Sequence, residues 1–433
     1  MSRSGGFLSK GRPGLARNAL VDFQYLRALG YAPYEGAAIG EVIRAAGEAR
    51  RRGSGRDAVV EAWRAQGRHL RAEADSALEA GSPVGARHRY FRAYNYLRVA
   101  EFFFDRHQEE EHRSLYQEGV EAFERAIGLL ATPAYPVEIP VSGGQSMPGY
   151  LFRPDESHSA RPTVVIMGGG DGHGEEMYFL GGVPTALERG YNVLLFHAPG
   201  QRGMLHRDDT QVFRPDSEAF VSPVIDFVLE HEWVDPDRIA VYGLSFGGYH
   251  VLRAASCDSR ISAVVASAPM PDMFEILLDT AVENVPGRLK TLIRRRLARL
   301  SPKTWTRLFA LPRRRNWAVE VMVDGYMMWT SGARSAGEAF TGLRRFRLGE
   351  LEAEISQPGL CLWSAGEGPA LRRRIEQFQD TIAGPSTLYA LTEADGADGH
   401  CGVGNVVHTS NVVYDWLDQS FQRSVRVEGT TRR

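Results

Sequence analysis

A serine between two glycines is the most chemically suggestive pattern in the chain. Residues 243–247 (GLSFG) follow the apolar run 238–242 and precede a helical pattern that begins at Phe246. A strand that turns sharply into a helix accommodates a serine at its apex only when the residues two before and two after it are glycines. The helix N-terminus beneath the serine stabilises negative charge. The pattern predicts a nucleophile elbow, with Ser245 as the nucleophile of acyl chemistry.

Acyl chemistry also needs backbone N–H groups at the place where the oxyanion develops. One donor should be the N–H of Phe246, the residue after the nucleophile. The other should come from the loop 168–172 (GGGDG), which follows the apolar run 163–167. Because glycines let the backbone approach a ligand closely, we expect Gly170 to be this donor, with Gly169 as the next candidate.

The general base must be a histidine in a loop after the last core strand. His400 lies in such a loop, 392–401, which is polar and rich in glycine, whereas His408 lies close to the final helix and is expected outside the site. The acid should follow the preceding strand, where Glu367 is the carboxylate of the loop 364–369. Asp272, after the strand before that, is the alternative acid.

The elements that must position these residues are read from hydrophobic periodicity. The chain is helical from about residue 20 to residue 130, and short apolar runs then alternate with helical patterns, interrupted by a helical, arginine-rich stretch at 274–346. Continuous apolar strands that alternate with helices predict a doubly wound, mostly parallel sheet covered on both faces. The expected fold class is α/β with an N-terminal helical cap and a helical insert.

The expected division of the chain follows these changes in pattern. The segments are a disordered tail (1–16), a helical cap region (17–131), the first part of the α/β core (132–272), a helical insert or lid (273–347) and the second part of the core (348–433).

Composition narrows the functional classes. The 433 residues have a formal net charge of −2, with 43% hydrophobic and 24% charged residues, which favours a globular protein and argues against nucleic-acid or membrane partners. The three cysteines form no CxxC pair, so neither a disulfide framework nor a zinc site is expected. The chain also lacks a secretory signal and an apolar run of about 18 residues. We therefore expect a cytoplasmic protein that needs neither a metal nor an organic cofactor.

The segment Lys290–Arg315 is strongly basic and contains no acidic residue. Its cations are either a solvated helical face or a docking surface for an acidic carrier protein. The sequence leaves open whether the chain forms a homodimer. The basic residues are Lys290, Arg294, Arg295, Arg296, Arg299, Lys303, Arg307, Arg313, Arg314 and Arg315.

Several segments resemble one group of hydrolases. The group includes 2,6-dihydroxypseudooxynicotine hydrolase, the FrsA-like esterases and the fungal hydrolase that shortens a polyketide in pigment synthesis. The similar segments are 168–176 (GGGDGHGEE), 189–200 (RGYNVLLFHAPG), 213–227 (FRPDSEAFVSPVIDF), 234–249 (VDPDRIAVYGLSFGGY), 399–401 (GHC), 415–417 (DWL) and the helical stretch 87–104.

The resemblance implies an α/β-hydrolase fold with a helical cap, and it implies hydrolysis of esters or of C–C bonds next to a ketone. It places the nucleophile at Ser245 and the base at His400. It also implies that Glu175 and Tyr178 contact the substrate, for which helix N-terminal capping is the alternative explanation. This chain has Glu367 at a position where relatives in the group tend to carry aspartate.

The predicted function is cleavage of a small, aromatic or polyketide-like molecule through an acyl-enzyme on Ser245. The insert contains the aromatic residues Trp305, Trp317, Tyr326 and Trp329. They either surround the substrate or form the insert's own core. Two alternatives stay open. One is an acyltransferase or cyclase with the same triad, and the other is a non-catalytic binding protein of hydrolase shape, which would lack a nucleophile or a base.

Overall fold

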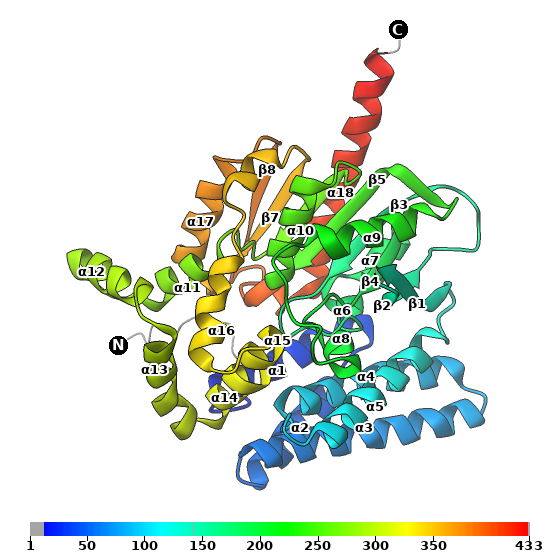
Figure 1. The fold of residues 1–433 in the computed structure, drawn as a ribbon. Coiled ribbons are helices and arrows are strands. Elements are labelled where there is room, and N and C mark those ends of the chain that lie inside the picture. Colours follow the sequence, from blue (N-terminus) through cyan, green and yellow to red (C-terminus); the bar gives the residue numbers. More distant parts are fainter. Residues whose placement is uncertain (1–12, 142, 432–433) are drawn as a thin grey trace.

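A mixed sheet forms the centre of the molecule (Figure 1). The computed structural model describes residues 13–141 and 143–431, so most of the predicted tail 1–16 lies outside the described residues. The strands are β1 (Ala134–Val141), β2 (Gln145–Phe152), β3 (Arg161–Met167), β4 (Asn192–Phe196), β5 (Val234–Leu244), β6 (Ala263–Ser267), β7 (Gly359–Ser364) and β8 (Ser386–Leu391).

The described residues form an eight-stranded sheet in the order β1-β2-β4-β3-β5-β6-β7-β8. Strand β2 runs antiparallel to both of its neighbours, and all the other pairs are parallel. The register pairs Met167 with Gly243 and Leu244 with Ser267. The glycine loop after β3 therefore starts beside the turn that carries Ser245.

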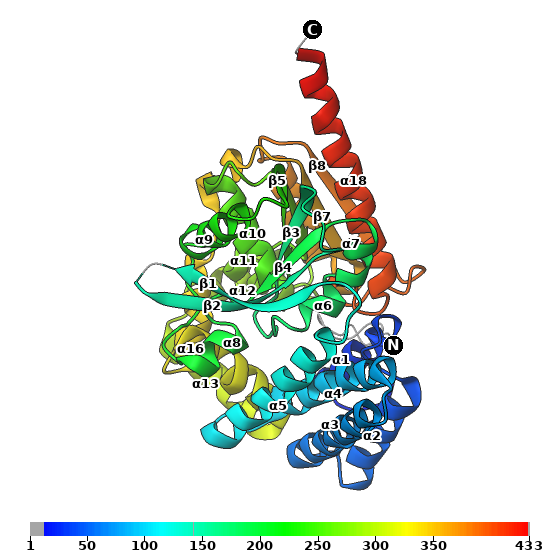
Figure 2. The ribbon, with the colours of Figure 1, turned by 90° about the vertical axis from the view of Figure 1, so that its right-hand side faces the viewer.

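Helices cover both faces of this sheet. The α-helices of the core are α6 (Met177–Leu180), α7 (Val183–Glu188), α8 (Arg202–Arg207), α9 (Glu218–Leu229), α10 (Phe246–Cys257), α17 (Pro369–Gln379) and α18 (Val406–Thr431). Figure 2 shows α7 and α18 on one face and α9 and α10 on the other. Strands β4 and β6 are consequently buried at every position, which explains their continuous apolar sequences. The predicted α/β-hydrolase fold is confirmed.

The last helix starts earlier than its apolar pattern predicted. We expected it from about Asn411, and it begins at Val406. The side chain of Asn405 accepts a hydrogen bond from the N–H of His408 at 3.2 Å, as an N-cap residue does. The cap residue, rather than the first apolar position, sets this boundary.

Five α-helices precede β1 within the described residues. They are α1 (Ala19–Gly30), α2 (Ile39–Arg51), α3 (Arg56–Glu79), α4 (Pro83–Phe103) and α5 (Glu109–Ile127), with the short turn η1 (Ala32–Tyr34). Helix α4 packs against both α3 and α5 and is buried over most of its surface, so its apolar and aromatic residues face in every direction. This helical body lies against α6 and α8 of the core (Figure 1).

The insert between β6 and β7 is helical, as its sequence indicated. It comprises α11 (Met273–Ala281), α12 (Gly287–Ala298), α13 (Pro302–Arg315), α14 (Trp317–Glu320), the π-helix η2 (Val321–Met328), α15 (Trp329–Ser331), α16 (Ala336–Gly342) and the 3₁₀ turns η3 (Leu343–Arg345) and η4 (Gly349–Glu354). It has a small core of its own formed by Phe274, Leu278, Trp305 and Phe340. Trp305 is therefore a packing residue of the insert. The division into domains stays a prediction.

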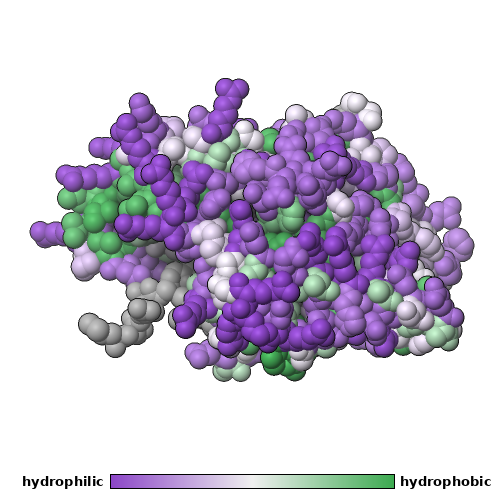
Figure 3. Space-filling model, turned by 90° about the horizontal axis from the view of Figure 1, so that it is seen from below, coloured by the Kyte–Doolittle hydropathy of each residue, from purple (hydrophilic) through white to green (hydrophobic). Residues whose placement is uncertain are grey.

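Helices α12 and α13 carry the basic segment and also expose leucines. Seen from below, apolar side chains gather on the side where these helices lie (Figure 3). The leucines are Leu289, Leu292, Leu308 and Leu311, each about half exposed. Arg294 pairs with Asp279, and Arg313 pairs with Asp324, so some of the cations bind within the insert itself. Docking of an acidic carrier protein on this segment stays a prediction.

Across the described ranges, no helix combines the length and the apolarity that crossing a bilayer requires.

Candidate active site

Ser245 occupies a strained turn between β5 and α10. Its backbone has φ 56° and ψ −121°, a conformation that L-residues rarely adopt. A Cβ atom added at Gly243 would lie 2.2 Å from the carbonyl oxygen of Gly247, and one added at Gly247 would lie 2.6 Å from that of Gly168. These contacts explain why glycines flank the serine. The turn has the geometry of a nucleophile elbow.

The structure brings His400 and Glu367 together with this serine. His400 Nε2 lies 2.8 Å from Ser245 Oγ, and His400 Nδ1 lies 2.6 Å from Glu367 Oε1. Glu367 is 2% exposed, and its other carboxylate oxygen accepts the N–H of Ser364 at 2.9 Å. Because Nδ1 faces a carboxylate, it carries the proton, which leaves Nε2 as an acceptor for the serine hydroxyl. The three side chains form one continuous hydrogen-bonded chain.

The surroundings of His400 shift its pKa. Burial lowers the pKa of the imidazole, but Cys401 and the Glu367 carboxylate act in the opposite direction and leave the pKa raised overall. A raised pKa makes the imidazole a stronger proton acceptor.

Asp272 does not reach this histidine. It is the N-cap residue of α11, where its side chain accepts the N–H of Glu275 at 3.1 Å. It also lies 3.9 Å from Arg347. The structure thus places Glu367 at His400 and Asp272 at the start of the insert.

The glycine loop after β3 lies against the serine through Gly169 rather than Gly170. A Cβ atom added at Gly169 would lie 2.9 Å from Ser245 Cβ, whereas one added at Gly170 would meet the hydroxyl of Tyr326 at 2.0 Å. The N–H of Phe246 belongs to the first residue of α10, whose early N–H groups have no acceptor within the helix. By this measure Gly169 lies nearer than Gly170 to the reacting oxygen, and the choice of the N–H donor between them stays a prediction.

A cavity of about 470 Å³ opens above Ser245 and His400. The cap contributes Leu20, Phe23 and Gln24 of α1, and the insert contributes much of the remaining wall. Four methionines stand among its lining side chains, namely Met270, Met273, Met322 and Met327. Methionine is flexible and polarisable, so such a wall adapts to an irregular apolar ligand. A site of this size and polarity fits a small organic molecule.

Of the four insert aromatics predicted from the sequence, Tyr326 lines this cavity. Trp317 packs on Phe103 of the cap, with ring centroids 5.5 Å apart. Trp329 packs on His206, with centroids 5.2 Å apart. Together with Trp305, these tryptophans hold the insert together or against the cap.

The residues expected to contact substrate by resemblance lie elsewhere. Glu175 is 1% exposed and accepts hydrogen bonds from Tyr150 at 3.0 Å and from His197 at 3.1 Å. Tyr178 is buried and stacks on Phe91 of α4, with ring centroids 4.8 Å apart. Neither side chain lines the cavity above Ser245. Both join the core to the cap.

A cap residue that sequence reasoning missed holds the glycine loop after β3 in place. Arg27 of α1 lies 2.7 Å from Asp171 and also pairs with Glu176. Burial raises the pKa of Asp171, but the attraction of Arg27 outweighs burial and lowers this pKa to about 2, so the carboxylate stays ionised. Asp171 was visible in the sequence as the acidic residue of the GGGDG loop. Its partner, Arg27 in a distant helix, had no such signal.

A second buried polar cluster lies between cap and core. Glu101 of α4 is within 3.4 Å of His112, His206 and His173. Glu101, His112 and His206 are arranged closely enough to hold a metal, as are Glu367, His400 and Cys401. However, the guanidinium of Arg202 lies 3.3 Å from Glu101 and supplies the positive charge that a metal would bring. We assign the Glu101 cluster to joining the cap and the core.

This cluster predicts a loss of stability in acid. Burial lowers the pKa of His206 to about 4, whereas an unfolded histidine titrates near about 6.5. The unfolded state therefore binds more protons in this interval, and the free energy of unfolding falls as the pH drops through it. The pKa of Glu101 is also depressed, since Arg202 and its histidine neighbours outweigh burial, so its stabilisation is lost in the same direction.

The measurement is the urea midpoint at about pH 7.5 and about pH 5, which should decrease at the lower pH. His206→Asn should reduce this decrease, because asparagine does not titrate. A midpoint that is unchanged, or that rises in acid, would contradict the account of the cluster.

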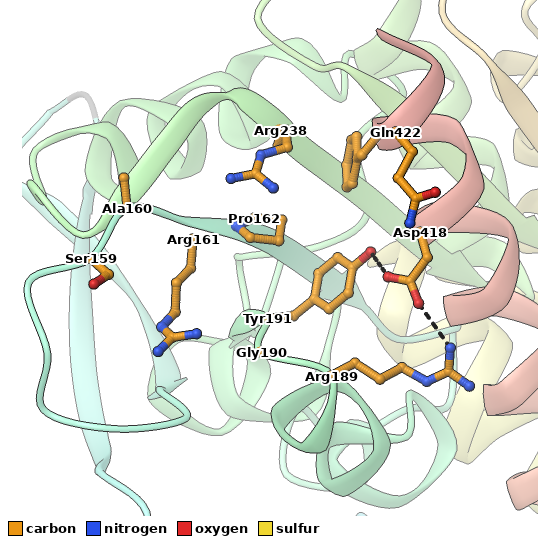
Figure 4. A pocket seen from close by; sticks show the side chains of 11 residues that line it. Ser159, Ala160, Arg161, Pro162, Arg189, Gly190, Tyr191, Arg238, Asp418 and Gln422 are labelled. Atoms are coloured by element: carbon orange, nitrogen blue, oxygen red, sulfur yellow. Dashed lines mark hydrogen bonds and ion pairs between the residues drawn. The ribbon is translucent and has the colours of Figure 1, made fainter. Parts of the chain in front are cut away.

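A further cavity, of about 670 Å³, lies beside the amino ends of β3 and β4, whereas Ser245 follows the carboxyl end of β5 (Figure 4). Arg161, Arg189 and Arg238 line it. Each is paired with a carboxylate, with Arg189 2.9 Å from Asp418, so these cations are neutralised locally. The structure offers no reason to place chemistry there.

Comparison with known proteins identifies the family. The model of the FrsA-like esterases matches residues 59–301. The chain is 30% identical over 429 residues to the hydrolase LUC6 of Fusarium sp, covering 93% of this chain and 97% of that protein. It is 36% identical over 263 residues to the 20-hydroxy-prefusarin hydrolase FUS2 of Gibberella moniliformis, covering 59% of this chain and 62% of FUS2.

Solved structures agree on the fold. The crystal structure of 2,6-dihydroxy-pseudo-oxynicotine hydrolase superposes with a TM-score of 0.65 at 18% identity, covering 90% of this chain and 94% of that one. AbyA5 superposes with a TM-score of 0.55 at 17% identity, covering 85% and 88%. With its α/β-hydrolase fold and its match to the family model, this chain belongs to the FrsA-like esterase family of hydrolytic enzymes.

Proposed function

We propose that this protein is a serine hydrolase that cleaves an ester or a ketone-adjacent C–C bond through an acyl-enzyme. The observation that carries the proposal is the hydrogen-bonded chain from Ser245 through His400 to Glu367, at the floor of a largely apolar cavity. The arrangement matches the roles of nucleophile, base and orienting acid in acyl transfer.

The proposed reaction starts when His400 Nε2 removes the proton from Ser245 Oγ as this oxygen attacks the substrate carbonyl. Glu367 stabilises the imidazolium that forms. The N–H groups of Phe246 and Gly169 donate to the oxyanion, and each such donor contributes roughly 10²–10³ in rate. His400 then protonates the leaving group, and water, deprotonated by the same imidazole, releases the acyl group from Ser245.

The chemistry of the cavity supports a small, largely apolar substrate. Its wall combines methionines with aromatic rings such as Phe213 and Phe346. FUS2, a relative, is a 20-hydroxy-prefusarin hydrolase, which fits an aromatic or polyketide-like molecule as the substrate class for this chain.

The test is product analysis with purified protein, aryl and alkyl esters, and β-diketones. We expect release of a carboxylic acid from at least one class. Adding an alcohol or amine separates hydrolysis from acyl transfer, because an acyltransferase would form a new ester or amide instead of the acid. Binding of these compounds without turnover would favour the non-catalytic alternative and contradict the proposal.

A further inference from the structure

Tyr326 places a phenolic hydroxyl beside the oxyanion loop. It lines the cavity with Ser245 and His400, although it comes from the insert. A Cβ atom added at Gly170 would lie 2.0 Å from the Tyr326 hydroxyl, and one added at Gly169 would lie 3.4 Å from Ser245 Oγ. Consecutive Cα atoms are about 3.8 Å apart. The two hydroxyls therefore stand beside neighbouring residues of one loop.

This hydroxyl is available as a donor. Among the described residues, the Tyr326 hydroxyl has no hydrogen-bond partner, and the side chain of Thr330 and the N–H of Trp329 both donate to the Tyr326 backbone carbonyl instead. Burial, and secondarily the Asp171 carboxylate, raise the pKa of the phenol above its usual value, so it keeps its proton. A neutral phenol in an apolar cavity needs a partner, and a bound ligand is the one the site can supply.

The backbone around Tyr326 is also unusual. Residues Val321–Met328 form a π-helix, which is rare and often occurs at functional sites. Its widened turn lies in the segment that carries Tyr326 to the cavity. The same segment provides Met322 and Met327 to the wall, so one irregular element presents both the apolar surface and the hydroxyl.

We propose that the Tyr326 hydroxyl donates a hydrogen bond to the oxygen of the leaving group when Ser245 cleaves a 1,3-dicarbonyl substrate. The proposal rests on the proposed serine mechanism and names the substrate class of the same site. In this mechanism the N–H groups of Phe246 and Gly169 donate to the oxyanion. The Tyr326 hydroxyl lies beside Gly170, the next residue of the loop, where a second substrate oxygen would lie.

The chemistry makes use of this second donor. When the C–C bond next to the attacked carbonyl breaks, its electron pair passes to the leaving carbon and is shared with the second carbonyl oxygen as an enolate. The proton that His400 took from Ser245 returns to that carbon. An ester of the same acyl group instead releases an alkoxide, which takes this proton on its own oxygen. A donor at the second oxygen therefore stabilises the transition state for the diketone and not for the ester.

The experiment compares a symmetrical β-diketone with the alkyl ester of the same acyl group, so both pass through one acyl-enzyme. In Tyr326→Phe, the ratio of kcat/KM for diketone to kcat/KM for ester should fall about 10- to 100-fold, as expected for losing a hydrogen bond to a charged group, with the loss mainly in kcat. Tyr135→Phe removes a hydroxyl from the surface strand β1 and should leave the ratio unchanged.

An unchanged ratio in Tyr326→Phe would overturn the proposal, and so would a wild-type enzyme that cleaves the ester but not the diketone. Labelling of Ser245 by a fluorophosphonate, at the wild-type rate in Tyr326→Phe, shows that the triad remains assembled. If wild-type Ser245 takes no label, or Ser245→Ala keeps its activity on both substrates, the serine mechanism itself fails, which is a separate result.

Discussion

Replacing Ser245 with alanine should lower kcat by about 10⁴- to 10⁶-fold on any accepted substrate, as removal of a triad nucleophile does. In the proposed mechanism the hydroxyl oxygen of Ser245 is the atom that bonds to the acyl group. The residual rate should come from the oxyanion donors and from substrate binding. The measurement is initial-rate kinetics with the best ester or diketone found in the screen.

The variant should fold normally, because alanine removes one oxygen and keeps the Cβ of the strained turn. Its melting temperature therefore serves as the control. Retention of more than about one tenth of the wild-type rate by a correctly folded Ser245→Ala protein would remove Ser245 from the nucleophile's role.

Exchanging Glu367 for glutamine should lower kcat by about 10⁴-fold, the effect of an orienting acid that loses its charge. The amide preserves the size of the side chain, but it no longer stabilises the imidazolium and can present an N–H to Nδ1. That contact favours the tautomer in which Nε2 carries the proton, and His400 then cannot accept one from Ser245. Loss of the carboxylate should also lower the pKa of His400, which kinetics across pH would detect.

Asp272→Asn is the matched control, since it makes the same chemical change in the other candidate acid. Asp272 caps α11 and does not contact His400, and asparagine caps helices as well as aspartate does, so we expect nearly normal stability and nearly normal kcat. A large loss of kcat in Asp272→Asn, together with a small one in Glu367→Gln, would reverse the assignment of the acid.

Local sequence signals predicted three residues that the structure brings together, Ser245, His400 and Glu367. The strand before Ser245, the two glycines around it and the helix after it lie within one short stretch, so the nucleophile turn is encoded where it forms. Glu367 and His400 were found by their order behind consecutive strands, because parallel strands bring the loops at their carboxyl ends to one edge of the sheet.

Contacts between distant segments were not predictable in the same way. Arg27 meets Asp171, and Glu101 meets His206, only because the cap folds over the core. Periodicity shows which face of a helix is apolar but not which polar residue another element places against it. The same limit applies to Glu175 and Tyr178. The resemblance placed them at the substrate, but in the structure their motif joins the cap to the core.

Sequence patterns could not distinguish between neighbouring or similar residues. Gly169 and Gly170 are equivalent in sequence terms, and the register of β3 against β5 decides which one meets Ser245. Tyr326 was one of several aromatic residues in the insert. It reaches the cavity from a π-helix, for which the sequence carried no recognisable signal.

The central claim is that His400 activates Ser245 as a nucleophile, and covalent labelling tests it most directly. The wild-type protein should react with a fluorophosphonate, and mass spectrometry of its peptides should place one adduct on Ser245. In His400→Ala, labelling should slow by several orders of magnitude while the fold persists. An adduct on another residue, or equal labelling rates in the two proteins, would contradict the account.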